Sequence, residues 1–183
     1  MTTRAHLVVL AGPSGVGKSS VIKEALSVLP NTWVSVSATT RAPRPGEVDG
    51  INYFYVTDEQ FDQMIANNEL LEWANYTNNR YGTPRKPVEE KLSAGIPVLL
   101  EIEVQGAGQI RESMPEALLV FLEPPTWADL EARLAGRGTE SQTQVQARLD
   151  AALKELESKG LFDYVIVNDD VNRAAAQLVQ YLS

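Results

Sequence analysis

Residues Gly12–Ser19, which read Gly-Pro-Ser-Gly-Val-Gly-Lys-Ser, have the clearest chemical meaning in this chain of 183 residues. They match the phosphate-binding pattern G-x-x-x-x-G-K-[ST] at every position. In this pattern the glycines let backbone N–H groups converge on phosphate oxygens, the lysine reaches the β- and γ-phosphates, and the serine hydroxyl binds Mg²⁺. Lys18 and Ser19 occupy those last two positions. The pattern predicts a nucleoside triphosphate site and leaves open what is done with the phosphate.

A second group of residues has the types that bind a phosphate. Arg41 and Arg44 stand three residues apart in a polar loop, and Tyr53 and Tyr81 could add phenolic O–H donors. Paired guanidinium groups form permanently charged, bidentate clamps for a phosphate. Phosphoryl transfer depends mostly on positioning and charge neutralisation, so a second clamp facing the first suits an acceptor monophosphate. Taken alone, the two arginines could also be solvated loop charges.

Two carboxylates follow a predicted strand in Glu101-Ile102-Glu103. The alternation of side chains places Glu101 and Glu103 on the same side of the strand, near its carboxyl end, where ligands of α/β proteins bind. Glu101 is a candidate for holding a magnesium-bound water. Both residues could instead be solvated charges at a strand end.

The elements that must position these residues alternate between strands and helices, as in a parallel α/β sheet. Continuous apolar runs predict strands buried on both faces, and apolar residues at helical spacing predict amphipathic helices. The strands are expected at residues 6–11, 34–37, 98–102, 118–122 and 164–167, and the helices at residues 21–29, 126–134, 145–156 and 171–182.

Residues from about 38 to 90 break this rhythm with polar, aromatic and strand-rich sequence. A polar loop at residues 39–50 precedes extended segments at residues 53–56 and 70–77, and a short helix is expected at residues 88–92. Thr57 with Gln60 three residues later forms a capping-box pattern that predicts the start of another helix. We interpret the segment as a subdomain inserted into the α/β core.

Several short motifs, in order over nearly the whole chain, resemble those of guanylate kinases. They are Gly12-Pro13-Ser14-Gly15, Ser37-x-Thr39-Thr40-Arg41-x-Pro43-Arg44-x-Gly46-Glu47, Glu72-Trp73, Tyr81-Gly82-Thr83, Gln105-Gly106, Gly136-Arg137-Gly138-Thr139 and Val167-Asn168-Asp169-Asp170. The resemblance implies transfer of the γ-phosphate of ATP to GMP, giving ADP and GDP, with Mg²⁺ as cofactor. It also implies one domain over residues 1–183, with a core at about 1–37, 91–134 and 159–183, a GMP-binding insertion at about 38–90 and a helical lid at about 135–158.

The resemblance assigns the acceptor site. Arg41, Arg44, Tyr53 and Tyr81 would hold the GMP phosphate, and the whole expected GMP-binding set is Ser37, Arg41, Arg44, Glu47, Tyr53, Glu72, Tyr81, Thr83 and Glu103. Ser37, Glu72, Thr83 and Glu103 would read the guanine. Glu72 makes physical sense, because a carboxylate can accept hydrogen bonds from guanine N1–H and the N2 amino group together, and adenine has neither donor. Glu103 departs from the family, which commonly has an aspartate there, so its base contact could be direct, shifted or through water.

The donor site and the catalytic residues follow in the same way. The expected ATP-binding residues are Gly12, Pro13, Ser14, Gly15, Val16, Gly17, Lys18, Ser19, Ser20, Arg137 and Asn168, and the expected catalytic residues are Lys18, Arg41, Arg137 and Arg148. Ser19 and, through water, Glu101 are the expected metal ligands. For Asn168 a role in a turn is the alternative, and Arg133 could be a lid residue or a surface charge on its helix.

The composition and charge of the chain limit the classes of molecule that it is expected to bind. The net charge is −8, yet residues 1–46 have five basic residues against Glu24 alone, so that segment carries +4 and the remainder −12. An acidic protein with a small basic segment suits an anionic small molecule better than a nucleic acid. No apolar stretch approaches the roughly 20 residues that span a membrane, and no obligatory protein partner is evident. The absence of cysteine excludes disulfides and suits the cytoplasm.

Two other functions stay open from the sequence. A kinase with the same phosphate loop could act on another phosphorylated small molecule such as a ribose phosphate, although Glu72 and Thr83 favour a base-reading site. A guanylate-kinase-like module that binds peptides is the non-enzyme alternative. Such modules typically lack an intact phosphate loop, whereas Lys18 and Ser19 are present here.

Overall fold

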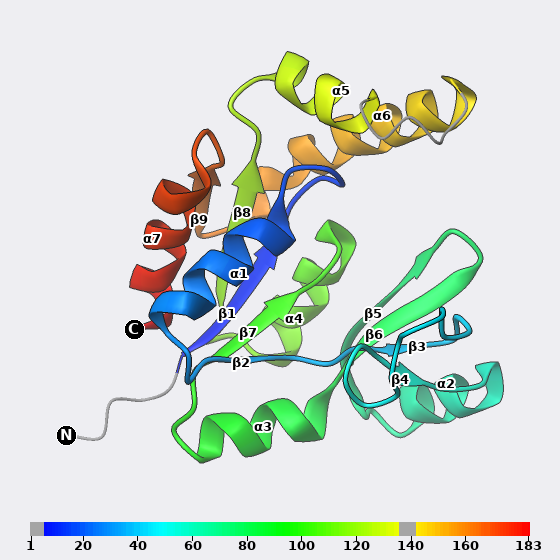
Figure 1. The fold of residues 1–183 in the computed structure, drawn as a ribbon. Coiled ribbons are helices and arrows are strands. Elements are labelled where there is room, and N and C mark those ends of the chain that lie inside the picture. Colours follow the sequence, from blue (N-terminus) through cyan, green and yellow to red (C-terminus); the bar gives the residue numbers. More distant parts are fainter. Residues whose placement is uncertain (1–5, 136–141) are drawn as a thin grey trace.

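The computed structural model describes residues 6–135 and 142–183, and over this part of the chain two β-sheets are surrounded by helices (Figure 1). The larger sheet has five strands in the order β2-β7-β1-β8-β9, and all neighbouring strands are parallel. Its strands are β1 (Leu7–Ala11), β2 (Trp33–Val34), β7 (Val98–Glu101), β8 (Leu118–Glu123) and β9 (Tyr164–Val167).

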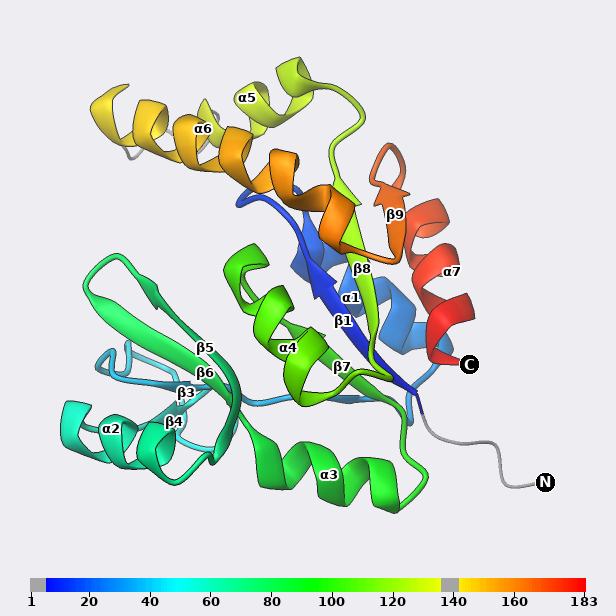
Figure 2. The same ribbon diagram turned by 180° about the vertical axis from the view of Figure 1, so that it is seen from behind.

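Helices cover both faces of this sheet. Val8 and Leu10 of β1 belong to one apolar cluster with residues of α1 (Lys18–Val28) and α7 (Val171–Leu182). Leu7 and Val9 belong to a second cluster, with residues of α3 (Arg85–Ser93) and α4 (Ala107–Ser113), on the face that Figure 2 turns toward the reader. Burial on both faces explains why the central strand is apolar at every position.

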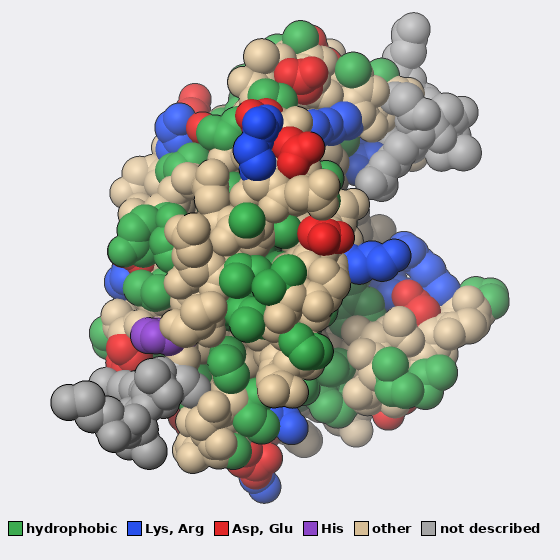
Figure 3. Space-filling view, turned by 60° about the vertical axis from the view of Figure 1, so that its left-hand side comes forward, with side chains coloured by type: hydrophobic (Ala, Val, Ile, Leu, Met, Phe, Trp, Pro, Cys, Tyr) green, Lys and Arg blue, Asp and Glu red, His purple; other side chains and the backbone are tan. Residues whose placement is uncertain are grey.

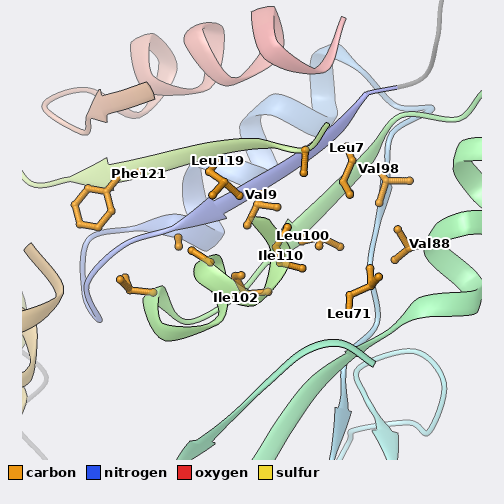
Figure 4. Close-up of a cluster of buried hydrophobic side chains, with 14 residues drawn as sticks. Leu7, Val9, Leu71, Val88, Val98, Leu100, Ile102, Ile110, Leu119 and Phe121 are labelled. Atoms are coloured by element: carbon orange, nitrogen blue, oxygen red, sulfur yellow. The ribbon is translucent and has the colours of Figure 1, made fainter. Parts of the chain in front are cut away.

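The smaller sheet has four strands in the order β4-β3-β6-β5, namely β3 (Ala38–Thr39), β4 (Phe54–Tyr55), β5 (Leu70–Tyr76) and β6 (Asn79–Pro84), among the described residues. Helix α2 (Asp58–Ala66) packs on it through Phe61. The predicted capping box is present: the Thr57 hydroxyl accepts from Gln60 N at 3.2 Å, and the Gln60 side chain accepts from Thr57 N at 2.8 Å. Leu71 of β5 reaches the core of the larger sheet, beside Val88 and Leu100 (Figure 4).

Helices α5 (Trp127–Ala135) and α6 (Gln142–Glu157) lie beyond the carboxyl ends of β1 and β8 (Figure 1). They share a small apolar cluster built on Leu130, Leu134 and Ala152. Two 3-10 turns complete the path, η1 (Val104–Gly106) and η2 (Ser158–Leu161). In the described part of the chain, no helix combines the length and apolar character needed to cross a bilayer.

The predicted fold class is confirmed: the core is a parallel sheet with helices on both faces, and a second sheet accompanies it. The expected strand at residues 34–37 is shorter and earlier, at Trp33–Val34, and β3 extends to Thr39, into the expected polar loop. Strand β6 and helix α4 were not expected. Neither has a strong local signal, because β6 contains Asn79, Gly82 and Pro84, and α4 is short and contains glycine.

Candidate active site

A cavity of about 620 Å³ separates the carboxyl end of the larger sheet from the smaller sheet. The corresponding hollow is visible in Figure 3, between the body of the molecule and the lobe at lower right, with Lys and Arg side chains at its edge. The predicted site residues that line the cavity are Lys18, Ser19, Ser37, Arg41, Arg44, Glu47, Tyr53, Glu72, Tyr81, Glu101 and Glu103. Residues of both predicted substrate sites therefore face one space.

The phosphate loop connects β1 to the first turn of α1. Gly15 and Gly17 have φ angles of 83° and 98°, in the left-handed region that favours glycine. The Lys18 ammonium donates to the carbonyl oxygen of Gly12 at 2.6 Å, so its charge lies over the loop. Ser20, which follows the loop and belongs to the predicted ATP-binding set, is exposed in the first turn of α1. The loop thus presents a helix N-terminus and a cation to the cavity, an arrangement suited to an anion.

Asn168 and Arg133 secure this loop from outside. The Asn168 side-chain amide donates to the Val16 carbonyl at 2.8 Å, and the Arg133 guanidinium donates to the same oxygen at 3.1 Å. Arg133 also donates to the Asn168 carbonyl at 3.2 Å. A Cβ at Gly17 would come within 2.6 Å of the Asn168 amide nitrogen, so a larger residue there would displace it. The predicted adenine contact of Asn168 stays a prediction, and the contact of Arg133 with the loop was missed.

Helix α6 also reaches the phosphate loop. The Arg148 guanidinium donates to the Ser14 hydroxyl at 2.8 Å, although the two residues are 134 positions apart in the chain. This contact brings a cation of the predicted catalytic set to the phosphate loop. Arg137, the other predicted arginine of this region, lies outside the described residues.

Glu47 organises the arginines of the predicted phosphate clamp. One of its carboxylate oxygens accepts from Arg41 at 2.9 Å, and the other accepts from the Arg44 backbone N–H and the Tyr55 hydroxyl, each at 2.7 Å. These hydrogen bonds, that of Arg41 first, lower the pKa of Glu47 to about 2. The guanidinium of Arg41 also lies 5.3 Å from the ring centre of Tyr53. Glu47, predicted to bind GMP, therefore holds Arg41 in place in this structure.

Tyrosines surround the clamp. The rings of Tyr53 and Tyr81 meet edge to face with centres 5.8 Å apart, and both line the cavity. Burial raises the pKa of Tyr53, which keeps its hydroxyl a neutral hydrogen-bond donor. Tyr55 was missed by the sequence analysis, although its spacing of two from Tyr53 along a predicted strand was a signal that both lie on one face.

Glu72 is a carboxylate almost removed from solvent. It lies in β5 with an exposed fraction of 5%, and the Thr83 hydroxyl donates to it at 2.7 Å. Burial raises the pKa of Glu72 to about 7, against the lowering effect of hydrogen bonds from Thr83 and with a smaller raising effect from the charge of Glu103. Such a group gains from a ligand that donates hydrogen bonds to its ionised form. Thr83 is fully buried behind Glu72, and its predicted contact with guanine stays a prediction.

The remaining predicted residues lie near the end of β7 and after β2. Glu101 and Glu103 both line the cavity, as their alternation suggested, and Ser37 lines it from the segment before β3. Burial raises the pKa of Glu101, while the charge of Lys18 and a hydrogen bond from Ser19 act in the opposite direction. The Ser19 hydroxyl and the Glu101 carboxylate are thus neighbouring oxygen donors. Mg²⁺ prefers oxygen ligands and takes only one or two from protein when it binds with phosphates and water, so this donor set fits it.

Comparisons with known proteins agree along the whole chain. A family model described as "Guanylate kinase" matches residues 4–183. The chain is 54% identical over 178 residues to "Guanylate kinase" of Thermobifida fusca, covering 97% of this chain and 91% of that protein. It is 57% identical over 176 residues to "Guanylate kinase" of Streptomyces coelicolor, covering 96% and 89%. The crystal structure of guanylate kinase from Anaplasma phagocytophilum has a TM-score of 0.77 at 34% identity, covering 99% of this chain and 86% of that one.

Proposed function

Because the chain belongs to the guanylate kinase family, it phosphorylates GMP with ATP to give GDP and ADP, and we propose that its two substrates meet in the cavity between the two sheets. One observation carries this proposal: Lys18 and Ser19 of the phosphate loop line the same cavity as Arg41 and Glu72 of the smaller sheet. Direct transfer requires donor and acceptor phosphates to be held next to each other, away from competing water.

The donor side is the phosphate loop with its cations. The loop N–H groups and Lys18 bind the β- and γ-phosphates of ATP, and Lys18 exchanges its present bond to the Gly12 carbonyl for phosphate oxygens. Arg148, held beside Ser14, and Arg137 bring positive charge to the phosphoryl group as it transfers. Asn168 lies at the adenine end of the donor site.

Ser19 would hold Mg²⁺ directly, and Glu101 would hold it through water. When it is bound, the ion neutralises charge on the phosphate oxygens. The shared position of Lys18, Ser19 and Glu101 supports the assignment, because all three line the same cavity and two of them offer oxygen donors.

The acceptor side holds the GMP phosphate with Arg41, Arg44, Tyr53 and Tyr81. Glu47 acts on this group by orienting Arg41 and by fixing the backbone at Arg44. An oriented guanidinium loses less conformational entropy when the phosphate binds, so the clamp is preorganised.

The guanine is read by Glu72, with Ser37, Thr83 and Glu103 around it. The ionised carboxylate accepts from N1–H and from the N2 amino group. An adenine would leave the carboxylate buried without those partners, a penalty that can discriminate by roughly 10⁴. The position of Glu72, buried yet lining the cavity, supports this role. Glu103 also lines the cavity and completes the set at the purine edge.

Separate apolar clusters support a division of the chain into a core, an insertion at about 38–90 and a lid at about 135–158. Phe61 and Leu70 centre one cluster in the smaller sheet, and Leu130 centres another between α5 and α6. Elements with cores of their own can move relative to the main sheet, as substrate closure requires. A cytoplasmic location, expected from the lack of cysteine, is also part of the proposal.

A coupled assay of ADP formation tests the proposed substrate pair. ATP with Mg²⁺ is supplied with GMP, AMP, UMP or CMP in turn, and only GMP is expected to give rapid turnover. Rates with AMP comparable to those with GMP would contradict the role of Glu72. Lys18→Ala is the control that separates this kinase from a contaminating one.

A further inference from the structure

Glu72, the proposed guanine reader, lies on a strand whose outer edge is closed by a helix of the core. Strand β5 is the last in the order β4-β3-β6-β5, so within residues 6–135 and 142–183 one of its edges has no strand beside it. An edge strand leaves backbone N–H and C=O groups unpaired unless something covers them. Here the residues after η1 cover the edge, because Gln109 and Ser113 of α4 both contact the β5 backbone.

Gln109 pairs with Trp73 as a neighbouring strand would. Its side-chain nitrogen donates to the Trp73 carbonyl at 2.7 Å, and its side-chain oxygen accepts from the Trp73 N–H at 3.0 Å. The Ser113 hydroxyl donates at 2.9 Å to the carbonyl of Leu71, which lies two residues before Trp73 in β5. In a strand, alternate residues direct their backbone groups to the same side. The two anchored residues therefore flank Glu72 and fix its backbone from both sides.

The register of β5 changes at this point. The pairing with β6 shifts between Leu70 and Glu72, which marks a bulge immediately before the carboxylate. A bulge redirects the side chains that follow it and weakens the local ladder. The Ser113 bond to Leu71 lies at this irregularity, so α4 contacts β5 where its register with β6 changes.

Gly106 leaves space for the carboxylate itself. A Cβ at Gly106 would overlap Glu72 Oε2 and would come within 3.0 Å of Glu72 Cδ and 3.2 Å of Ile102 Cδ1. The backbone of Gly106 is ordinary right-handed helix, with φ −77° and ψ −19°, which alanine adopts readily. Glycine is therefore required here by space and not by backbone conformation.

We propose that residues 104–113, the η1–α4 segment, position the guanine-reading carboxylate. Gln109 and Ser113 fix the strand on either side of Glu72, and Gly106 leaves the space that its carboxylate occupies. All three are positioning residues, since none of them is among the described residues that line the cavity. Ile110, on the same helix, is fully buried in the core cluster of the larger sheet. Helix α4 therefore connects the backbone on either side of Glu72 to that core. The inference rests on the proposed role of Glu72.

The test compares Gln109→Met and Gly106→Ala with the wild type. Glu112→Gln, which changes an exposed residue of the same helix, is the matched control. Gln109→Met keeps the side-chain length but removes both bonds to Trp73, and we expect the KM for GMP to rise about 10-fold. The KM for ATP should stay within about two-fold, and the preference for GMP over IMP, which lacks the N2 amino group, should fall. A thermal melt of each variant establishes that it is folded.

A double-mutant cycle separates positioning from a general structural effect. Gly106→Ala acts through the carboxylate, so in a Glu72→Gln background it should lower kcat/KM for GMP much less than it does alone. Full additivity would overturn the inference, and so would equal losses in the GMP and ATP parameters. Wild-type GMP kinetics in both Gln109→Met and Gly106→Ala would also overturn it.

The same experiment keeps the two proposals apart. If Glu72→Gln leaves GMP kinetics unchanged, the proposed guanine reader is wrong, and the positioning role fails with it. If Glu72→Gln impairs GMP use while Gln109→Met and Gly106→Ala do not, only the positioning role is wrong.

Discussion

Replacing Glu72 by glutamine should change how the stability of the ligand-free protein depends on pH. Burial raises the pKa of Glu72 from the ordinary 4.5 to about 7, so the folded protein binds this proton more tightly than the unfolded chain does. Stability contributed by the group is therefore complete below about pH 4.5 and is lost as the pH rises toward 7. Glutamine does not titrate, so Glu72→Gln escapes this loss.

The size of the effect follows from the shift. One pKa unit corresponds to about 1.4 kcal/mol, and a shift from 4.5 to about 7 makes the full loss roughly 3 kcal/mol. Between about pH 5.5 and about pH 8, where the protein is far enough from its pI of about 4.7 to stay soluble, the loss amounts to roughly 2 kcal/mol. The wild type should therefore lose about 2 kcal/mol relative to Glu72→Gln across this interval.

Urea unfolding of both proteins at the two pH values, without nucleotide, measures this difference. Effects of the substitution that do not depend on pH cancel in the comparison, and Glu112→Gln controls for the loss of one carboxylate at an exposed position. The same pH dependence in the wild type and in Glu72→Gln would refute the view that Glu72 is a carboxylate destabilised by burial. Saturating GMP should reduce the wild-type loss, because GMP binds the ionised carboxylate.

Three further predictions concern the rest of the site. Lys18→Ala should lower kcat at least about 100-fold while GMP binding, measured by calorimetry, stays within about two-fold, because Lys18 acts on the donor phosphates; weakened GMP binding would contradict this. Glu47→Gln should raise the KM for GMP about 10-fold and leave the KM for ATP unchanged, because it releases Arg41. Steady-state kinetics with each substrate varied in turn measure both values, and a raised KM for ATP with an unchanged KM for GMP would contradict the prediction. Asn168→Ala should cost about 0.5–1.5 kcal/mol in urea unfolding and raise the KM for ATP, because the Val16 carbonyl loses one of its two side-chain donors and keeps Arg133. An unchanged KM for ATP would argue against a role of Asn168 in shaping the loop.

Much of the core was predictable because its signals are local. The last strand and helix, Tyr164–Val167 and Val171–Leu182, lie where the apolar patterns put them, and the phosphate loop joins a strand to a helix as its motif requires. Strand β6 was missed because its residues have low strand propensity, and it forms through pairing with β5 and β3 on its two sides. Helix α4 was missed because its stability comes from burial of Ala107 and Ile110.

The sequence indicated candidate residues for the site but not the contacts that they make. Residue types and motifs indicated candidate side chains for both substrates, and eleven of these residues line one cavity. The sequence contains no signal that Arg133 holds the Val16 carbonyl, because a bond to a backbone oxygen more than 100 residues away depends on the complete fold. The pairing of Gln109 with Trp73 is hidden for the same reason.

The central claim is that the Glu72 carboxylate selects guanine, and the ratio of kcat/KM for GMP to that for AMP tests it most directly. In the wild type this ratio should be roughly 10⁴ or higher, because adenine leaves the buried carboxylate unpaired. In Glu72→Gln we predict that the ratio falls at least about 100-fold, chiefly through loss of GMP activity. A ratio that stays at its wild-type value in Glu72→Gln would contradict the claim.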